Sequence, residues 1–469
     1  MYKEQIDAYF ERADVRADLI AAVGRLVGVK SVREEPAPGA PFGPGPRAAL
    51  DEGLKLCTEM GFAAKDYDHY VGLADLNDKE TQLHILGHLD VVGEGTGWNT
   101  DPYTCVEKDG MLYGRGVSDD KGPVVAALFA MKAIRDLGIP VSKNVRLIMG
   151  TDEESGSQDI AYYYAREPYA PMTFTPDADF PVINVEKGHY HPNFGAKWAS
   201  ETVTPRVSAM TGGFRVNVVP PEAEATVLGV APADLANLCA GVEERSGAKF
   251  TVNEIEGGVK VHCLGKNAHA AMPEGGINAI QALLEVLARL PLADCPSTKA
   301  VRAMAGLFPF GDLYGRALGI AQSDKSGDLT LNLAIIKLEE NGFQALFDSR
   351  VPVCANRENC AQVCEAAFEK CGIEIFGGKE MMPAHEVEAD SPLVKTLLKC
   401  YSDVTGVADP QPIAIGGGTY VHDIPGGVAF GCDFPGFDPK MHSANEQASV
   451  ENLLKSARIF ALAIARLCA

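Results

Sequence analysis

The sequence predicts an α/β protein with a mostly parallel central sheet flanked by helices, together with an inserted α+β domain. A mostly apolar run over residues 83–89 predicts a buried strand, and a second run over residues 145–149 predicts another. Residues 124–137 between them have helical periodicity, with Pro123 in the expected first turn and Gly138 beyond the end. A strand, a helix and a strand in this order are typical of a parallel sheet.

The length of 469 residues predicts more than one domain. Between residues 187 and 383 the pattern changes to short strands alternating with amphipathic helices, such as residues 279–290. We expect 187–383 to be a lid domain inserted into a discontinuous domain made of residues 1–186 and 384–469. Further helices are expected over residues 14–26, 391–405 and 450–467, and a loop rich in Pro and Gly over residues 35–47.

The composition argues against several classes of partner. A net charge of −21 disfavours nucleic acid, because phosphate binding requires clustered Lys and Arg. The first residues are charged and lack the apolar run of a signal peptide, and no segment reaches the length of a membrane helix. Twelve cysteines without Cys-x-x-Cys pairs are typical of reduced thiols. We therefore expect a cytoplasmic protein whose partners are small molecules.

Acidic residues and histidines gather where the expected strands end. They are His88, Asp90, Asp119, Glu153, Glu154, Asp177 and His442. In open α/β sheets, the loops beyond the carboxyl ends of the strands form the binding crevice. Imidazole and carboxylate ligands suit zinc, cobalt or manganese, and several carboxylates with two histidines suffice for two ions bridged by one carboxylate.

Each of these residues also has an ordinary structural interpretation. A lone histidine at a strand end is more often hydrogen-bonded structure than a ligand, an aspartate before a helix is usually an N-cap, and a Glu–Glu pair is usually solvated. Their joint occurrence favours a metal site, because so many buried charges without a cation would be costly.

The same residues resemble the motifs of the dinuclear zinc peptidases that include carnosinases, aminoacylases and desuccinylases. The matching motifs, in the family's order and spacing, are His88-x-Asp90, Gly114-Arg-Gly followed by Asp119-x-Lys-Gly, Glu153-Glu-x-Gly156, Asp177 and His442. Over essentially the whole chain, the sequence is most similar to the bacterial dipeptidases of β-Ala-Xaa and other Xaa dipeptides. The supporting segments are residues 176–181, 217–220, 327–330 and 416–420.

The resemblance implies a role for each residue of the centre. The metal ligands would be His88 and Asp177 for one ion, Glu154 and His442 for the other, and Asp119 bridging both. Glu153 would be the general base, and Asp90 would hydrogen-bond the far nitrogen of His88. The ions would be Zn²⁺, with Mn²⁺ or Co²⁺ as alternatives. Asp120 stands where the family usually has an apolar residue, and Asp119 is taken as the ligand.

The lid would supply the groups that bind the substrate. By the resemblance, His269 would donate to the developing oxyanion, and Arg350 would hold the terminal carboxylate in a fork. Asn217 and the backbone of Gly416 and Gly417 would complete that pocket. Without the resemblance, His269 and the glycines would be assigned to turns, and Arg350 to a surface ion pair.

The expected function is hydrolysis of dipeptides with a free amino terminus, of the β-Ala-Xaa type, in peptide catabolism. Asp177 would also bind the free amine. An amidohydrolase of N-acyl amino acids would share every metal residue, and an inactive metal-binding homologue is the alternative outside enzymes. Glu153 counts against the latter, because a structural site needs no spare base. A lid long enough to supply its own His269 predicts a monomer, with a homodimer as the alternative.

Overall fold

A computed structural model describes residues 2–469, which divide into two compact units. Unit 1 comprises the chain up to Val185 with Glu386–Ile413 and Gly418–Ala469, and unit 2 comprises Glu186–His385 with Ala414–Gly417. The expected lid, residues 187–383, lies within the long segment of unit 2. Its role as a lid stays a prediction.

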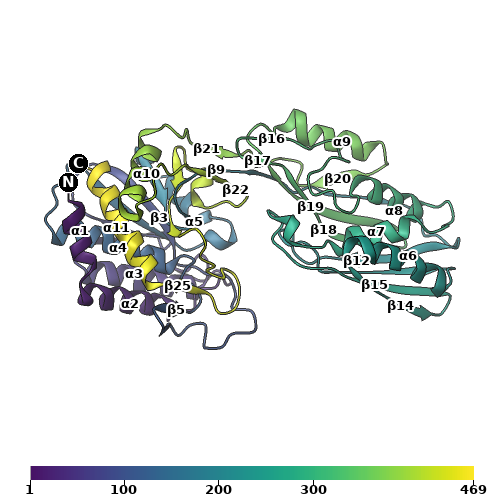
Figure 1. Cartoon of the computed structure of the whole chain (residues 1–469), viewed down its shortest axis with the longest axis horizontal. Coiled ribbons are helices and arrows are strands. Elements are labelled where there is room, and N and C mark those ends of the chain that lie inside the picture. Colours follow the sequence, from purple (N-terminus) through teal and green to yellow (C-terminus); the bar gives the residue numbers. More distant parts are fainter. Residues whose placement is uncertain (1) are drawn as a thin grey trace. The chain divides into compact units, whose positions relative to one another are not determined.

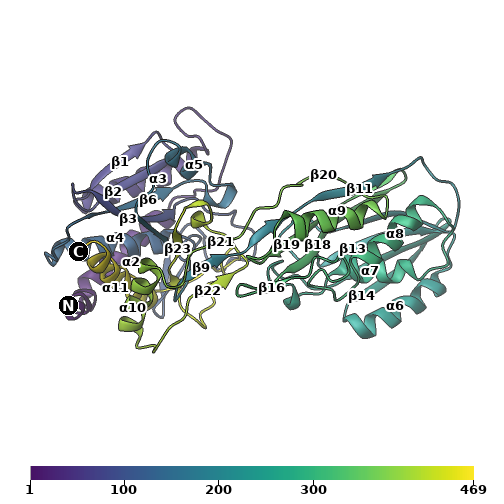
Figure 2. The same ribbon diagram turned by 90° about the horizontal axis from the view of Figure 1, so that it is seen from above.

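Unit 1 contains a nine-stranded sheet, drawn in Figures 1 and 2. Its helices are α1 (Lys3–Phe10), α2 (Ala13–Val27), α3 (Pro44–Glu59), α4 (Lys121–Asp136), α5 (Gln158–Tyr164), α10 (Pro392–Thr405) and α11 (Val450–Leu467), with the short helices η1 (Glu153–Ser155) and η4 (Tyr420–Asp423). The strands are β1 (Ala63–Tyr67), β2 (Val71–Asp75), β3 (Thr81–His88), β4 (Val106–Lys108), β5 (Met111–Tyr113), β6 (Asn144–Gly150), β7 (Met172–Thr175), β8 (Ala178–Asp179), β9 (Ile183–Glu186), β21 (His385–Glu386), β22 (Ile413–Ile415), β23 (Gly427–Ala429), β24 (Cys432–Asp433) and β25 (Gln447–Ser449).

The centre of this sheet is parallel and its ends are antiparallel. The strand order is β1-β2-β6-β3-β7-β23-β9-β21, with β22 beside β9. Strands β6, β3, β7 and β23 run parallel, whereas β1, β2 and β9 pair in antiparallel fashion. Helices α4 and α11 lie side by side (Figure 1) and bury apolar residues in one core with the central strands. The predicted α/β fold with a parallel sheet is therefore confirmed.

The predicted elements of unit 1 are found with small shifts at their ends. Helix α11 covers the predicted residues 450–467, while α4 begins three residues before the predicted start at residue 124. The structure also contains α3, which begins inside the expected loop 35–47. Pro44 and Pro46 lie in its first turn, where proline is compatible with a helix because those N–H groups have no intrahelical partner.

Unit 2 contains a second nine-stranded sheet with helices on one face (Figure 2). Its helices are α6 (Pro232–Ser246), α7 (Ala279–Ala288), α8 (Pro296–Leu307) and α9 (Gln362–Glu369), with the short helix η2 (Pro273–Gly275) and the π-helix η3 (Arg357–Ala361). Its strands are β10 (Gly188–Tyr190), β11 (Asn193–Lys197), β12 (Arg206–Gly212), β13 (Glu222–Leu228), β14 (Lys249–Ile255), β15 (Gly258–Leu264), β16 (Ser323–Asp324), β17 (Gly327–Asp328), β18 (Thr330–Glu339), β19 (Gly342–Val351) and β20 (Glu374–Gly377). The apolar faces of these helices and strands form a core of their own.

Two further sequence features can be followed in the structure. All twelve cysteines are free thiols. Within residues 2–469, every helix is too short or too polar to cross a membrane.

A buried histidine couples the stability of unit 1 to pH. His84, in the middle of β3, is 3% exposed, and its Nδ1 lies 3.0 Å from the hydroxyl of Tyr164. Burial, followed by the nearby charge of Arg146, lowers the pKa of His84 to about 4 from the ordinary value of 6.5. The folded chain therefore holds this imidazole neutral in a range where an unfolded chain would protonate it.

We predict that His84→Gln makes the chain less sensitive to acid. Because the folded-state pKa is depressed, the contribution of His84 is present above pH 6.5 and is lost as the pH falls towards 4. The gap between these pKa values corresponds to about 3 kcal/mol. Urea unfolding with a metal chelator present, at pH 7 and pH 4, should show a smaller loss of unfolding free energy in the variant by about that amount. Equal losses would contradict the assignment.

Candidate metal centre and substrate-binding residues

The candidate metal ligands come from the ends of adjacent strands in unit 1. His88 is the last residue of β3, Glu153 and Glu154 begin η1 after β6, and Asp177 follows β7. Asp119 lies just before α4. Because β6, β3 and β7 are neighbouring parallel strands, their carboxyl ends bring these side chains to the same edge of the sheet.

Asp119 lies between two imidazole groups. Its Oδ1 is 3.1 Å from Nε2 of His88, and its Oδ2 is 2.8 Å from Nε2 of His442. On one side, His88 Nε2 is also 3.4 Å from Oδ2 of Asp177. On the other side, His442 Nε2 is 3.2 Å from Oε2 of Glu154. The two oxygens of Asp119 thus face two different sets of ligand atoms, which is the arrangement a carboxylate bridging two ions requires.

Unpaired buried atoms indicate that a cation fits this cluster. Glu154 Oε1 is buried and has no hydrogen-bond partner among the described residues, and the buried Nε2 of His88 lies against the carboxylates of Asp119 and Asp177. Ligand atoms of His88, Glu153 and Asp177 lie within 4.8 Å of one another, and so do those of His88, Asp119 and Glu154. Buried polar atoms are normally paired, so these groups call for a partner that the protein does not supply. Imidazole and carboxylate donors suit Zn²⁺, Mn²⁺ or Co²⁺.

The pKa shifts point to a shortage of positive charge. Burial and then the charge of Asp119 raise the pKa of Asp177, and the same two causes raise that of Glu154 to about 7. Hydrogen bonds with Asp119 and Glu154 raise the pKa of His442 to about 11. Burial opposes ionisation of Asp119, but its hydrogen bonds with His442 and His88 outweigh burial and lower its pKa. A divalent cation would supply the charge that these carboxylates lack.

Asp90 holds the loop that carries the glutamates. Its Oδ1 accepts a hydrogen bond from the amide of Glu153 at 3.2 Å, and its Oδ2 accepts one from the amide of Glu154 at 3.1 Å. The nearest group to Nδ1 of His88 is the backbone carbonyl of Asp90 at 3.0 Å, and the Asp90 carboxylate lies at 3.4 Å. The expected contact of Asp90 with Nδ1 of His88 is thus made through the backbone carbonyl, while the carboxylate binds the two backbone amides.

Glu153 lies beside two of the candidate metal ligands, His88 and Asp177. Burial, and also the charge of Asp177, hold its pKa well above the ordinary range although the charge of His88 opposes the shift. A raised pKa makes this carboxylate a stronger base than an ordinary glutamate, which is what a general base requires.

Unit 2 gathers the residues expected to bind the substrate. The segments around Asn217 and His269 pair, because the amide of Ala270 donates to the carbonyl of Asn217 at 2.9 Å and Val218 forms a bridge with His269. Gly416 lies against the same segment, and a Cβ on it would come within 2.9 Å of the Cβ of Ala271. Only a glycine therefore allows this close approach. The neighbouring Gly417 has room for a Cβ.

The guanidinium of Arg350 already has partners inside unit 2. Its Nε and Nη2 donate to the two oxygens of Asp348 at 2.7 and 2.8 Å, and the pair is buried. Nη1 donates to the carbonyl of Gly416 at 2.7 Å and to Nε2 of His189 at 2.9 Å. The fork expected for a substrate carboxylate thus faces Asp348, which leaves one Nη2 hydrogen for a further acceptor.

Several residues of these sites escaped sequence reasoning. Two of them are Asp348, which binds Arg350, and His191, whose Nε2 lies 3.0 Å from Oδ1 of Asp348. Tyr420 donates to the buried Asp159 at 2.5 Å and packs edge-on against His88. Because such contacts join residues far apart in the chain, no local pattern predicts them.

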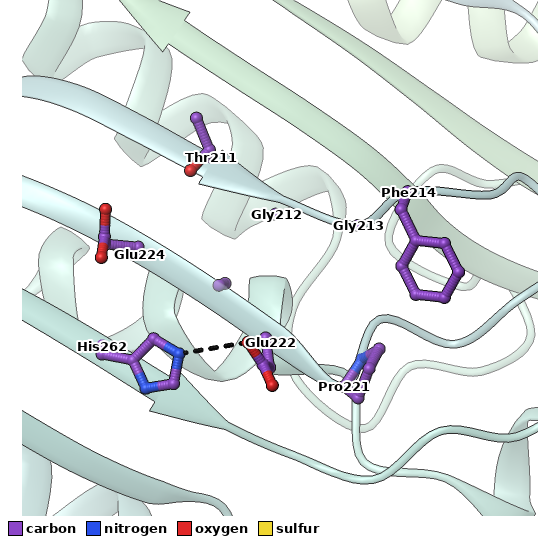
Figure 3. Close-up of a pocket in the computed structure, with 9 residues that line it drawn as sticks. Thr211, Gly212, Gly213, Phe214, Pro221, Glu222, Glu224 and His262 are labelled. Carbon is purple, nitrogen blue, oxygen red and sulfur yellow. Dashed lines mark ion pairs between the residues drawn. The ribbon is translucent and has the colours of Figure 1, made fainter. Parts of the chain in front are cut away.

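A shallow hollow of about 510 Å³ lies on unit 2, away from these residues (Figure 3). Its lining includes Phe214, which is 65% exposed, and the pair of His262 and Glu222 at 3.5 Å. Of the nine residues that line it, none is one of the residues expected to bind metal or substrate. We assign it no role.

The metal-centre geometry defines a candidate metal-dependent hydrolase, and comparison with known proteins gives its family. Residues 84–466 match the model of peptidase family M20/M25/M40. The protein named "Putative dipeptidase YtjP" of Bacillus subtilis is 35% identical, with 96% of this chain and 97% of that protein covered. A Staphylococcus aureus protein named "Putative dipeptidase SAR1836" is 32% identical, with coverage of 100% and 99%. The chain therefore belongs to peptidase family M20/M25/M40, as predicted, and is a metallopeptidase.

Solved structures share the fold at low sequence identity. Human carnosine dipeptidase 1 has a TM-score of 0.60 at 17% identity, with 100% of this chain and 99% of that chain covered. The dipeptidase Dug1p of Saccharomyces cerevisiae has a TM-score of 0.55 at 15% identity with the same coverage.

We predict opposite effects of Asp177→Asn on the metal-free and the zinc-loaded chain. Removing one buried carboxylate relieves repulsion, so the metal-free variant should melt at a higher temperature than the wild type. Zinc at about 100 times its dissociation constant adds about 2.7 kcal/mol per site to the wild type, and the variant should gain less. Differential scanning calorimetry with chelator and with Zn²⁺ measures both effects. Asp390→Asn, at an exposed carboxylate, is the matched control and should change neither.

Proposed function

We propose that this metallopeptidase hydrolyses dipeptides with a free amino terminus, including β-Ala-Xaa dipeptides. The observation that carries the proposal is the position of Asp119, whose two carboxylate oxygens face His88 and His442 separately. Asp177 and Glu154 complete the two sets of ligand atoms. The names of the relatives as dipeptidases support the choice among amide hydrolases.

The protein would hold two divalent ions, with Zn²⁺ favoured by the donor set and Mn²⁺ or Co²⁺ as alternatives. His88 and Asp177 would bind one ion, and Glu154 and His442 the other. When bound, such ions lower the pKa of a water molecule towards neutrality and polarise the scissile carbonyl.

The side chains of the site would then move the proton and orient the substrate. Glu153 accepts the proton of the attacking water and returns it to the leaving amine. Its raised pKa, caused first by burial, supports this role because it makes the carboxylate a stronger base. Asp90 keeps Glu153 in place through the backbone amide. His269 donates a hydrogen bond to the oxygen of the former carbonyl.

The two ends of the substrate would define its length. The remaining Nη2 hydrogen of Arg350, with Asn217 and the Gly416–Gly417 backbone, binds the terminal carboxylate. Asp177 binds the free amine besides holding its ion, because a carboxylate is the natural partner of an ammonium group. In a dipeptide, the ammonium group and the carboxylate belong to the two residues that the scissile bond joins. A dipeptide therefore matches a site that binds both charged groups. We further propose a monomer in the cytoplasm, where the free thiols would stay reduced.

Glu153→Gln should abolish turnover while leaving metal binding intact. Loss of the general base predicts a fall in kcat of about 10²- to 10⁴-fold, whereas the zinc content measured by mass spectrometry should match that of the wild type. Glu154→Gln is the control with the same chemical change one residue on, and it should lower the zinc content. Activity of Glu153→Gln within tenfold of the wild type would remove this residue from the mechanism.

A substrate panel distinguishes a dipeptidase from an amidohydrolase of N-acyl amino acids. The proposed contact of the free amine with Asp177 predicts that Ala-Xaa and β-Ala-Xaa exceed N-acetyl and N-succinyl amino acids by at least about 100-fold in kcat/KM. The same Xaa residue is used throughout, so only the amino end differs. A preference for the acylated substrates would overturn the proposed substrate class. No hydrolysis of either kind would favour an inactive metal-binding homologue.

A further inference from the structure

The position of His442 depends on contacts that other residues make with its loop. Its side chain is 54% exposed, so packing does not fix its position. Its backbone has φ of 58°, a left-handed conformation that non-glycine residues adopt at a cost. Lys440 and Asn445 in the same loop also have positive φ. An exposed ligand in a strained loop keeps its place only if neighbouring contacts hold the loop.

Glu446 provides the strongest of these contacts. It is fully buried, four residues after His442 and directly before β25. Its Oε1 accepts hydrogen bonds from the amides of Gly116, Ser118 and Asp119 at 3.0 to 3.2 Å. Successive amides that converge on one carboxylate form an anion-binding concavity. The same carboxylate therefore holds the loop that ends in Asp119 and the loop that carries His442.

Arg115 balances the charge of this buried carboxylate. Its Nη1 donates to Oε2 of Glu446 at 2.7 Å, and both side chains are almost fully buried. Its Nη2 donates to the carbonyl of Gly93 at 3.3 Å, and its guanidinium lies 5.2 Å from the ring centre of Trp98. The segment around Trp98 in turn contacts Asn445, which donates to the carbonyl of Gly97 and accepts from the amide of Asn99. The His442 loop is therefore held at two points, by Arg115 through Glu446 and by the Trp98 segment through Asn445.

We propose that Glu446 is a positioning residue that holds the His442 loop against the Asp119 loop and so sets His442 for one of the two metal ions, an inference that rests on the metal centre proposed above. His88 and Asp177 follow β3 and β7, whose positions are fixed by the parallel sheet. The ion held by Glu154 and His442 depends on the loop that Glu446 anchors. Loss of Glu446 therefore acts on that ion far more than on the other.

The test measures the two metal sites one at a time in the full-length chain. Metal-free wild type and Glu446→Gln are titrated with Zn²⁺ against a chromophoric chelator, and Co²⁺ absorption reports the ligand geometry. The glutamine keeps the shape but presents an NH₂ group to a pocket of donors. We expect one ion to bind about 10- to 100-fold more weakly, as found when the outer partners of metal ligands are replaced. The other ion should weaken less, because of these two loops it depends only on that of Asp119.

Asp75→Asn is the matched control. Asp75 pairs with Arg146 through two contacts of 2.9 Å in the same unit, but it contacts no candidate metal ligand. The Asp75→Asn variant should bind both ions with wild-type affinity. A loss of affinity in Glu446→Gln alone would then not be a result of general destabilisation. If Glu446→Gln does not fold by circular dichroism, Arg115→Lys carries the same expectation, because lysine cannot reproduce both contacts of the guanidinium.

The outcomes separate this inference from the proposed function. Two ions in the wild type, with both affinities unchanged in the variant or both lowered equally, overturn the positioning role while the dinuclear centre stands. Fewer than two ions in the wild type overturn the dinuclear centre itself.

Discussion

Mutual repulsion among buried carboxylates is the constraint on which the centre of unit 1 depends. Asp119, Glu153, Glu154 and Asp177 meet around the two imidazoles of His88 and His442, and protonated histidines alone compensate them poorly. Folding brings them together because each lies next to the end of an element that must be buried for other reasons. The energy released by burying β3, β6, β7 and α4 maintains a cluster that is unfavourable until cations enter.

Carboxylates that are not candidate ligands form the surrounding framework. Asp90 binds the amides of Glu153 and Glu154, and Asp159 binds those of Thr151 and Asp152. Glu446 binds the amides of the Asp119 loop. In each case a buried side chain satisfies backbone amides that no strand pairing or helical hydrogen bond satisfies. The loops of the centre are therefore held by side chains from distant parts of the sequence.

The sequence predicted the parallel core and the grouping of candidate ligands, because apolar runs locate strands and the groups follow them directly. Helix α3 escaped prediction, since its prolines also suit a loop. The partners of Arg350 and the contacts of Asp90 with backbone amides escaped as well. They depend on which strands and loops become neighbours, for example β10 beside β19, and this is a property of the folded chain. The metal and substrate roles of these residues stay predictions.

The short segment Ala414–Gly417 has a consequence for dividing the protein into fragments. It belongs to unit 2, although the chain on both sides of it belongs to unit 1. A fragment cut at the ends of Glu186–His385 would lack the Gly416 carbonyl that accepts from Nη1 of Arg350. That hydrogen bond would have to be replaced by solvent in a largely buried place. Expression of the inserted unit by itself therefore calls for the tetrapeptide to be joined back on through a linker.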